Sequence, residues 1–175
     1  LTQDAFDNAI RMLLAAGGST NAIIHLTAIA GRAGIKLPLE RFNELSETTP
    51  VIVNLKPGGK YLMEDLYYAG GVEAVLKKMS SLLNLDCLTV TGDSLGENIA
   101  DAECHNDDVV LSPENPLAKE GGLTVLKGSL APDGAVIKHI AASPELLKHT
   151  GRAIVFENPL DLKNRIDDPD LDVTK

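Results

Sequence analysis

A glycine-rich polar turn, Gly17-Gly18-Ser19-Thr20-Asn21, stands where one apolar helical pattern stops and another begins. The free N–H groups at the start of a following helix, together with the positive end of its dipole, could hold a carboxylate or a phosphate. The simpler interpretation is a turn between two helices in which a Ser or Thr caps the second. The lysine and the glycine spacing of a phosphate-binding P-loop are missing. From the residues alone, both an anion site and an ordinary cap remain open.

His25 follows Asn21 by about one helical turn, so the two side chains share a helix face. A histidine there could act as an acid or base, or donate a hydrogen bond to a substrate. The alternative is a buried histidine whose ring is satisfied by a backbone carbonyl. Neither interpretation is excluded by the spacing.

Three other groups of polar residues offer weaker evidence of a site. The stretch Lys56-Pro57-Gly58-Gly59-Lys60 could meet an anion or form a solvated basic turn. Glu64 and Asp65 are adjacent, and the side chains of adjacent residues point apart on a helix. This favours a role in the first turn of a helix, beside the positive end of its dipole, over a site of paired carboxylates. The stretch Cys104-His105-Asn106-Asp107-Asp108 has metal-ligating side chains without the repeat spacing that fixes their geometry, which favours a surface loop.

Helices are the main elements expected to position these residues in the first part of the chain. Apolar residues at helical spacing predict a helix over about 2–15 with Thr2 as its N-cap, and a second over 22–30. The second is apolar nearly all round, which predicts burial on every side. The other expected elements are helices over 39–45 and 72–83, a small helix after Ser94, a buried strand over 51–55 and a short strand over 88–90.

The pattern changes near residue 117. Short β-type runs follow at 123–126, 135–137 and 153–156, and Pro132-Asp133-Gly134 predicts a turn. Ser143-Pro144-Glu145 has the cap and the first-turn proline of a helix start. We therefore predict an α/β fold class, with a helix-rich part over residues 1–116 and a β-rich part over residues 117–175.

Composition excludes several classes of function. The 25 acidic residues outnumber the 16 basic ones, for a net charge of −9, which argues against non-specific nucleic-acid binding. Aromatic residues make up only 3%, too few for base-stacking platforms. No apolar run reaches the length of a membrane span. Cys87 and Cys104 do not make a disulfide framework, which favours a reducing cytoplasmic setting with neither nucleic-acid nor membrane partners.

Several motifs resemble, in order, those of one enzyme family. The run from Gly17 to Leu26 resembles a signature of the dihydroxy-acid dehydratase / phosphogluconate dehydratase family. The region around Gly151 and the stretch from Tyr61 to Gly71 are similar to the sugar-acid branch, such as the arabinonate dehydratases. The remaining matches are Leu88-Thr89-Val90-Thr91-Gly92, Glu120-Gly121-Gly122-Leu123, Leu130 to Lys138, His149 to Ala153, and Asp167 to Leu171.

The resemblance implies a hydro-lyase that removes water from a 2,3-dihydroxy acid or sugar acid, after which the enol tautomerises to a 2-keto acid. It also implies an iron–sulfur cluster held by cysteines, a magnesium ion that holds the substrate, and a serine alkoxide that takes the C2 proton. Hydroxide is a poor leaving group and a C2–H is a weak acid, so both need charge stabilisation. Members serve sugar-acid metabolism or branched-chain amino acid biosynthesis.

The chain departs from the family pattern in its chemical residues. It lacks the family's Cys-Asp-Lys segment, the cysteine stretch leading to Thr-Ala-Asn-Thr-Met, and the serine segment, and neither Cys87 nor Cys104 matches a cluster ligand. We therefore expect the middle of a longer enzyme: the end of its α/β domain and the start of a β-barrel-like C-terminal domain. By itself such a segment is expected to be inactive and to hold no cluster or magnesium.

Within this segment we expect Ser19, Thr20, Asn21 and His25 to lie nearest the substrate, and we assign no catalytic or metal-binding residue. The expected partner is a small hydroxy acid, and the apolar second helix favours a homo-oligomer. The alternative functions are a stand-alone anion-binding or regulatory module derived from the same fold, or a structural fragment without a ligand.

Overall fold

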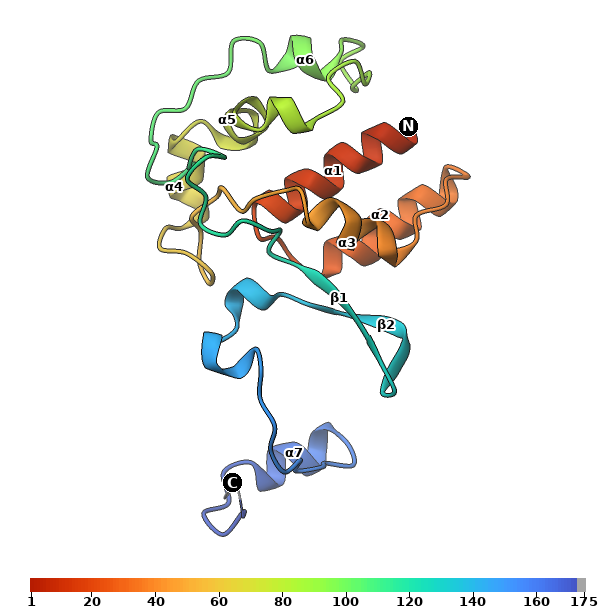
Figure 1. Cartoon of the computed structure of the whole chain (residues 1–175), viewed down its shortest axis with the longest axis vertical. Coiled ribbons are helices and arrows are strands. Elements are labelled where there is room, and N and C mark those ends of the chain that lie inside the picture. The colour runs from red at the N-terminus through yellow and green to blue at the C-terminus, as the bar shows by residue number, and fades with distance from the viewer. Residues whose placement is uncertain (173–175) are drawn as a thin grey trace. The chain divides into compact units, whose positions relative to one another are not determined.

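The computed structural model of the chain describes residues 1–172 (Figure 1). Residues 1–142 form one compact unit and the residues after them a second. The elements of the first unit are α1 (Gln3–Ala15), α2 (Asn21–Arg32), α3 (Leu39–Ser46), α4 (Met63–Tyr68), α5 (Gly71–Lys78), α6 (Leu95–Asn98), β1 (Thr124–Gly128) and β2 (Ala131–Ile137), with short 3-10 turns at Ser80–Leu82 and His139–Ala141. The second unit contains a 3-10 turn at Pro144–Leu146 and α7 (Pro159–Arg165).

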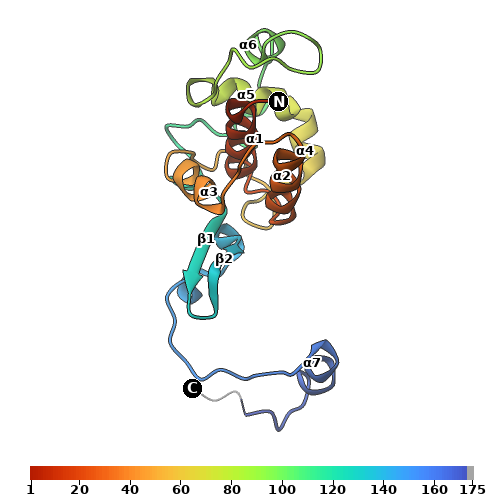
Figure 2. The same cartoon turned by 90° about the vertical axis from the view of Figure 1, so that its right-hand side faces the viewer.

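Helix α1 organises the first unit. Thr2 caps it as predicted, because its hydroxyl accepts a hydrogen bond from the Ala5 N–H at 3.2 Å. The helix contacts both α2 and α3, and Figure 2 shows it standing between them. One apolar core lies between these three helices and β1. Its buried members are Phe6, Ile10, Leu14, Ile23, Ala30, Leu37, Phe42, Leu45, Leu123 and Val125.

A second apolar core begins at the C-terminal end of α1. It joins Ala15 to the segment 51–55, to α4 and α5, and to Val109 and Val110. Residues 51–53 of the predicted strand over 51–55 are buried, but the stretch makes only isolated bridges, from Val51 to Ala118, from Val53 to Val110 and from Leu55 to Tyr61. Its neighbours are irregular segments, so no continuous ladder forms.

The outer face of α2 is not buried. Only Ile23 and Ala30 of this helix are buried, whereas Ile24 is 68% exposed and Ile29 49% exposed. The prediction of burial on every side is therefore wrong for this structure, because α2 packs against α1 and the core through one face only.

The hairpin of β1 and β2 is antiparallel, with Thr124 opposite Ile137 and Leu126 opposite Ala135. The predicted turn at Pro132-Asp133-Gly134 is wrong: the chain reverses at residues 129–130 and these three residues lie within β2. Gly134 has a φ of 109° and lies opposite a register shift between Leu126 and Gly128. A glycine at this position allows the backbone conformation that the irregular strand needs.

Two other predicted strands are absent from residues 1–172. The stretch 88–90 forms a loop with a single bridge from Leu88 to Ser94, and Val90 points fully into solvent. The stretch 153–156 has no regular secondary structure and no strand partner among the described residues. The described residues thus contain an α/β arrangement with one two-stranded sheet, and the barrel-like domain stays a prediction. The division of the parent protein after residue 116 likewise stays a prediction.

Within the second unit, α7 is capped by Asn158, whose Oδ1 accepts from the N–H groups of Leu160 and Asp161 at 3.0 Å. Arg165 lies one turn from Asp161 and pairs with it at 3.1 Å. None of the helices in the described part of the chain combines the length and the apolar character that a bilayer crossing needs.

The buried carboxylate of Asp7 generates a prediction about pH. Burial by itself would raise the pKa of Asp7, but hydrogen bonds from Arg41 and Gln3 outweigh it and hold the pKa below its ordinary 3.8. The ionised Asp7 therefore stabilises the folded state fully above its unfolded-state pKa. This stabilisation is lost as the pH falls through the folded-state pKa of Asp7. We expect urea unfolding of the chain to show this loss below about pH 4, and Asp7→Asn to abolish that part of the pH dependence.

Glu44 provides the matched control, because it pairs with the same Arg41 at 2.7 Å but is exposed. Glu44→Gln should change the unfolding free energy by less than about 0.5 kcal/mol and leave the acid loss in place. An unchanged acid profile in Asp7→Asn would show that this pair does not contribute to folding.

Gly122 generates a second prediction, about packing. A Cβ at this position would lie 2.7 Å from the Gly17 Cα, which is a backbone atom that cannot rotate away. We expect Gly122→Ala to lower the unfolding free energy by about 1–3 kcal/mol. Gly128→Ala is the control, because nothing lies within 4 Å of its Cβ position, and it should change stability by less than about 0.5 kcal/mol. Equal effects of the two substitutions in urea unfolding would contradict the packing argument.

Candidate functional site

The turn after α1 is built from backbone hydrogen bonds to the end of that helix. Gly17 has a φ of 53° and donates to the Leu14 carbonyl at 3.1 Å, and Gly18 donates to Leu13 at 2.9 Å. This is the Schellman arrangement, in which a left-handed glycine lets the chain turn back on the helix end. The turn places Ser19 and Thr20 immediately before α2.

The first amides of α2 are already bonded within the turn. The Asn21 N–H donates to Ser19 Oγ at 3.2 Å, the Ala22 N–H to the Ser19 carbonyl at 3.0 Å, and the Ile23 N–H to the Thr20 carbonyl at 3.2 Å. Ser19 thus performs the capping contact, and Thr20 makes no such bond. The expectation of free N–H groups for an anion is therefore wrong for these three amides, and any anion here needs another source of positive charge.

A cavity of about 450 Å³ lies beside this turn. Its polar lining residues are Ser19, Thr20, Lys56 and Lys138. The remaining lining residues are apolar or glycine: Met12, Ala16, Gly17, Gly18, Leu55, Met63, Leu66 and Val72. The lining residues thus comprise two lysines, two residues that carry a hydroxyl, and a majority that is apolar or glycine.

Tight backbone packing around Ile140 holds two sides of the cavity together. A Cβ on Gly58 would lie 3.0 Å from the Ile140 Cγ1, so the turn that follows Lys56 packs directly on that side chain. The neighbouring His139 bonds through Nε2 to the Gly121 carbonyl at 2.7 Å. The first contact attaches the segment carrying Lys138 to the segment carrying Lys56, and the second attaches it to Gly121.

The structure brings together only two of the four predicted substrate-pocket residues. Ser19 and Thr20 line the cavity, whereas Asn21 and His25 lie exposed on α2 and do not line it. The alternative of a buried histidine is wrong, because His25 is exposed. Thr20 also borders a second hollow of about 640 Å³, which lies between α2 and β2 and is mostly apolar.

The other polar groups have structural partners. Asp65 accepts from the Leu62 N–H at 2.7 Å and so stabilises the first turn of α4, which confirms its predicted role. Lys78 bonds to Asp107 at 2.5 Å and to the Val110 carbonyl. Burial lowers the pKa of Lys78, but its contact with Asp107 leaves the pKa above the ordinary value. The same contact lowers the pKa of Asp107.

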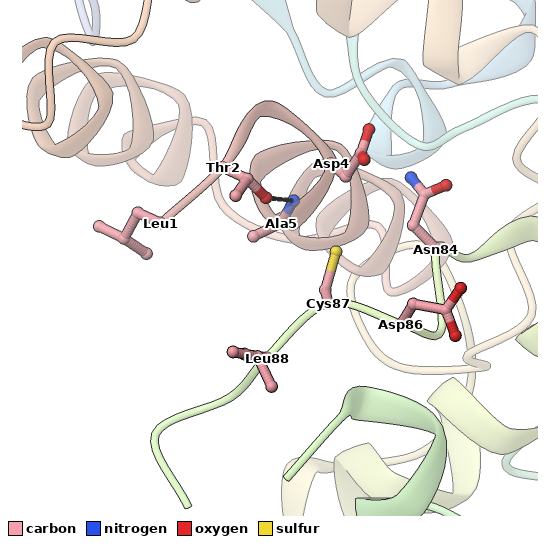
Figure 3. A pocket seen from close by; sticks show the side chains of 8 residues that line it. All are labelled: Leu1, Thr2, Asp4, Ala5, Asn84, Asp86, Cys87 and Leu88. Atoms are coloured by element: carbon pink, nitrogen blue, oxygen red, sulfur yellow. Dashed lines mark hydrogen bonds between the residues drawn. The ribbon is translucent and has the colours of Figure 1, made fainter. Parts of the chain in front are cut away.

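A third cavity, of about 410 Å³, lies at the start of α1 (Figure 3). Cys87 lies in its wall together with Asp4 and Asp86, and Figure 3 shows the sulfur directed toward the first turn of the helix. Cys87 is half-buried. Across residues 1–172, no group of three His, Cys, Asp or Glu side chains could hold a metal ion.

Comparison with known proteins decides the family. The family model described as "Dihydroxy-acid/6-phosphogluconate dehydratase N-terminal" matches residues 1–98. The model of the C-terminal part of the same family matches residues 108–175. The chain belongs to the dihydroxy-acid/6-phosphogluconate dehydratase family. The resemblance found in the sequence is thereby confirmed.

Individual relatives of two kinds match at nearly the same identity. The L-arabinonate dehydratase of Rhizobium leguminosarum bv. trifolii is 51% identical over 99% of this chain, and the L-arabonate dehydratase of Azospirillum brasilense is likewise 51% identical over 99%. The dihydroxy-acid dehydratase of Caldanaerobacter subterraneus is 52% identical over 90%. The chain spans about 30% of the length of these relatives.

The family assignment implies metal chemistry, and the described residues do not fit a cluster or a magnesium site. Cys87 and Cys104 are free thiols, and neither belongs to a group of three ligating side chains within residues 1–172. We therefore assign no ligand to this chain and derive no chemical step through such a group.

Lys138 is the site residue that sequence reasoning missed. It lies at the end of a β-type run and carries no local signal, whereas Lys56 belongs to the basic turn over residues 56–60. Only the packing of the hairpin end against the glycine turns brings the two lysines to one cavity.

Proposed function

We propose that the protein containing this chain is a hydro-lyase that dehydrates a 2,3-dihydroxy acid or a sugar acid to a 2-keto acid. The observation that carries this proposal is the match of both family halves, in order, along the chain. The identity of about half of all positions to enzymes named L-arabinonate dehydratase and dihydroxy-acid dehydratase supports it. Between these two kinds of substrate, a sugar acid is favoured by the motifs around residues 61–71 and 151.

The whole protein is proposed to use an iron–sulfur cluster and magnesium, which would stabilise charge on the leaving hydroxyl and on the substrate. Their ligands lie outside these 175 residues in this proposal, and the chain alone is inactive. The contribution of the chain is binding and orientation. The hydroxyls of Ser19 and Thr20 can exchange hydrogen bonds with substrate hydroxyls, and Asn21 and His25 are proposed to lie nearby.

We further propose that the whole protein is a cytoplasmic homo-oligomer. The support for self-association is the apolar outer face of α2, where Ile24 and Ile29 are exposed.

Turnover by the whole protein tests the proposed function. We expect L-arabinonate or a related aldonate to be converted to a 2-keto acid, detected as its semicarbazone, with no turnover by the 175-residue chain alone. Turnover by the 175-residue chain alone would contradict the proposal that the catalytic groups lie outside these residues. Absence of turnover in the whole protein, with an acid still raising its thermal stability, would favour the binding or regulatory module instead.

Replacement of His25 tests its proposed place near the substrate. Because His25 is exposed and makes no hydrogen bond or ion pair within the described residues, His25→Ala should change the unfolding free energy by less than about 0.5 kcal/mol. In the whole protein it should lower kcat/KM by about 10-fold, the effect of one lost hydrogen bond in the transition state. His105→Ala is the control, since His105 is exposed and does not line the cavity. An unchanged kcat/KM in His25→Ala would remove His25 from the site.

A further inference from the structure

The outer edge of β1, the edge that faces away from β2, is closed by side chains of α3. Both backbone groups of Val125 bond to the Asn43 amide. The Val125 N–H donates to Asn43 Oδ1 at 2.7 Å, and the Val125 carbonyl accepts from Asn43 Nδ2 at 3.0 Å. The Leu123 carbonyl accepts from Ser46 Oγ at 3.2 Å. A further strand therefore cannot pair with β1 at Val125.

The outer edge of β2 is open. Val136 lies opposite Val125 in the register of the hairpin. Opposite residues of an antiparallel pair alternate between those that exchange hydrogen bonds and those whose backbone groups point away from each other. Because Val125 bonds to Asn43, this pair is of the second kind, and the Val136 N–H and carbonyl point away from β1. Among residues 1–172, no backbone group outside the hairpin bonds to them.

Val136 is also part of the hollow of about 640 Å³ between α2 and β2. The α2 side of this hollow includes Ile24 and Thr27, and every residue that the structure places in its lining is uncharged. Ile24 is 68% exposed. An added strand bonds through its backbone and packs through alternate side chains, so it satisfies an open edge and an exposed apolar face together.

We propose that this hollow is the docking site of a β-strand from the part of the whole protein outside these 175 residues, an inference that rests on the proposed function. The strand pairs with the outer edge of β2 and directs alternate apolar side chains onto α2. A two-stranded hairpin is at best marginally stable by itself, so a third strand stabilises it. Because β1 is closed at Val125, β2 offers the edge at which the sheet grows.

A strand of the same polypeptide fits this groove better than a second copy of the chain. The chain spans about 30% of the length of its relatives, and the rest of a protein of that length can supply the strand. A tethered segment has a high effective concentration, whereas two copies that each carry a net charge of −9 repel each other. Ile29 does not line the hollow, so it stays available for the proposed self-association.

Docking at this place connects the rest of the protein to the candidate site. Thr20 borders both the hollow and the cavity beside the turn. A strand in the hollow therefore brings a part of the protein from outside this chain next to that cavity. The hollow itself is assigned to protein and not to substrate.

Cysteine labelling of the whole protein tests the proposal. Thr27→Cys places a small thiol in the lining of the hollow. Arg32→Cys is the matched control, because Arg32 is exposed on the same helix and does not line the hollow. With the strand docked, iodoacetamide should modify position 27 about 10-fold more slowly than position 32, because labelling then requires local opening. Peptide mass spectrometry measures both rates.

Hydrogen–deuterium exchange of the unsubstituted whole protein gives an independent readout. The Val136 N–H should exchange about 100-fold more slowly than an unprotected amide, because the added strand accepts its hydrogen bond. Leu130 is the internal control, since it lies in the turn of the same hairpin with a fully exposed side chain. Its amide should exchange at the unprotected rate.

Equal labelling at positions 27 and 32, or a Val136 amide that exchanges as fast as that of Leu130, would overturn the proposal. Shielding of position 27 that disappears on about 100-fold dilution would also overturn it, because the occupant is then a second copy. Unchanged melting temperatures establish that both variants are folded. Turnover is measured separately. Normal turnover with fast labelling at position 27 refutes the docking site and leaves the proposed function standing, whereas shielding without turnover refutes the function and supports the docking site.

Discussion

The site depends on one constraint: the last carbonyl groups of α1 have no partners inside the helix and must find hydrogen-bond donors elsewhere. An α-helix leaves its last four carbonyls without partners inside the helix. Here the Leu14 carbonyl accepts from Gly17 and Gly122, and the Ala15 carbonyl accepts from Ile52 and Val53 at 3.0 and 3.2 Å. A buried carbonyl left unsatisfied costs about 1–3 kcal/mol, so these segments are tied to the helix end. Through them the cavity walls are attached to one rigid element.

Close backbone approach explains how so many segments fit around one helix end. The contact between Gly122 and Gly17 leaves no room for a side chain, and Ile140 fills the space beside Gly58. The result is a small hollow whose charged groups come from loops, while the loops themselves are held by buried backbone bonds. The contact between Gly58 and Ile140 thus ties the segment that carries Lys56 to the segment that carries Lys138.

The helices were predictable because their signals are local. Thr2, the apolar spacing that follows it and the glycines after residue 16 define α1, and similar signals define α2 and α3. The strands were less predictable. Val90 belongs to a β-type run yet faces solvent, and the stretch 153–156 has no partner within the described residues. A strand needs a neighbour that a short window of sequence cannot specify.

The sequence by itself determined the family and the glycine-rich turn before α2, because motifs and helix signals are properties of adjacent residues. It also predicted Ser19 and Thr20 near the substrate; both line the cavity beside the turn, and their place beside a substrate stays a prediction. Tertiary structure alone decided that the α2 amides are occupied, that His25 is exposed, and that Lys138 joins Lys56 at one cavity. These outcomes depend on which distant segments meet at the end of α1, and that meeting is governed by packing and backbone hydrogen bonds over long separations in the chain.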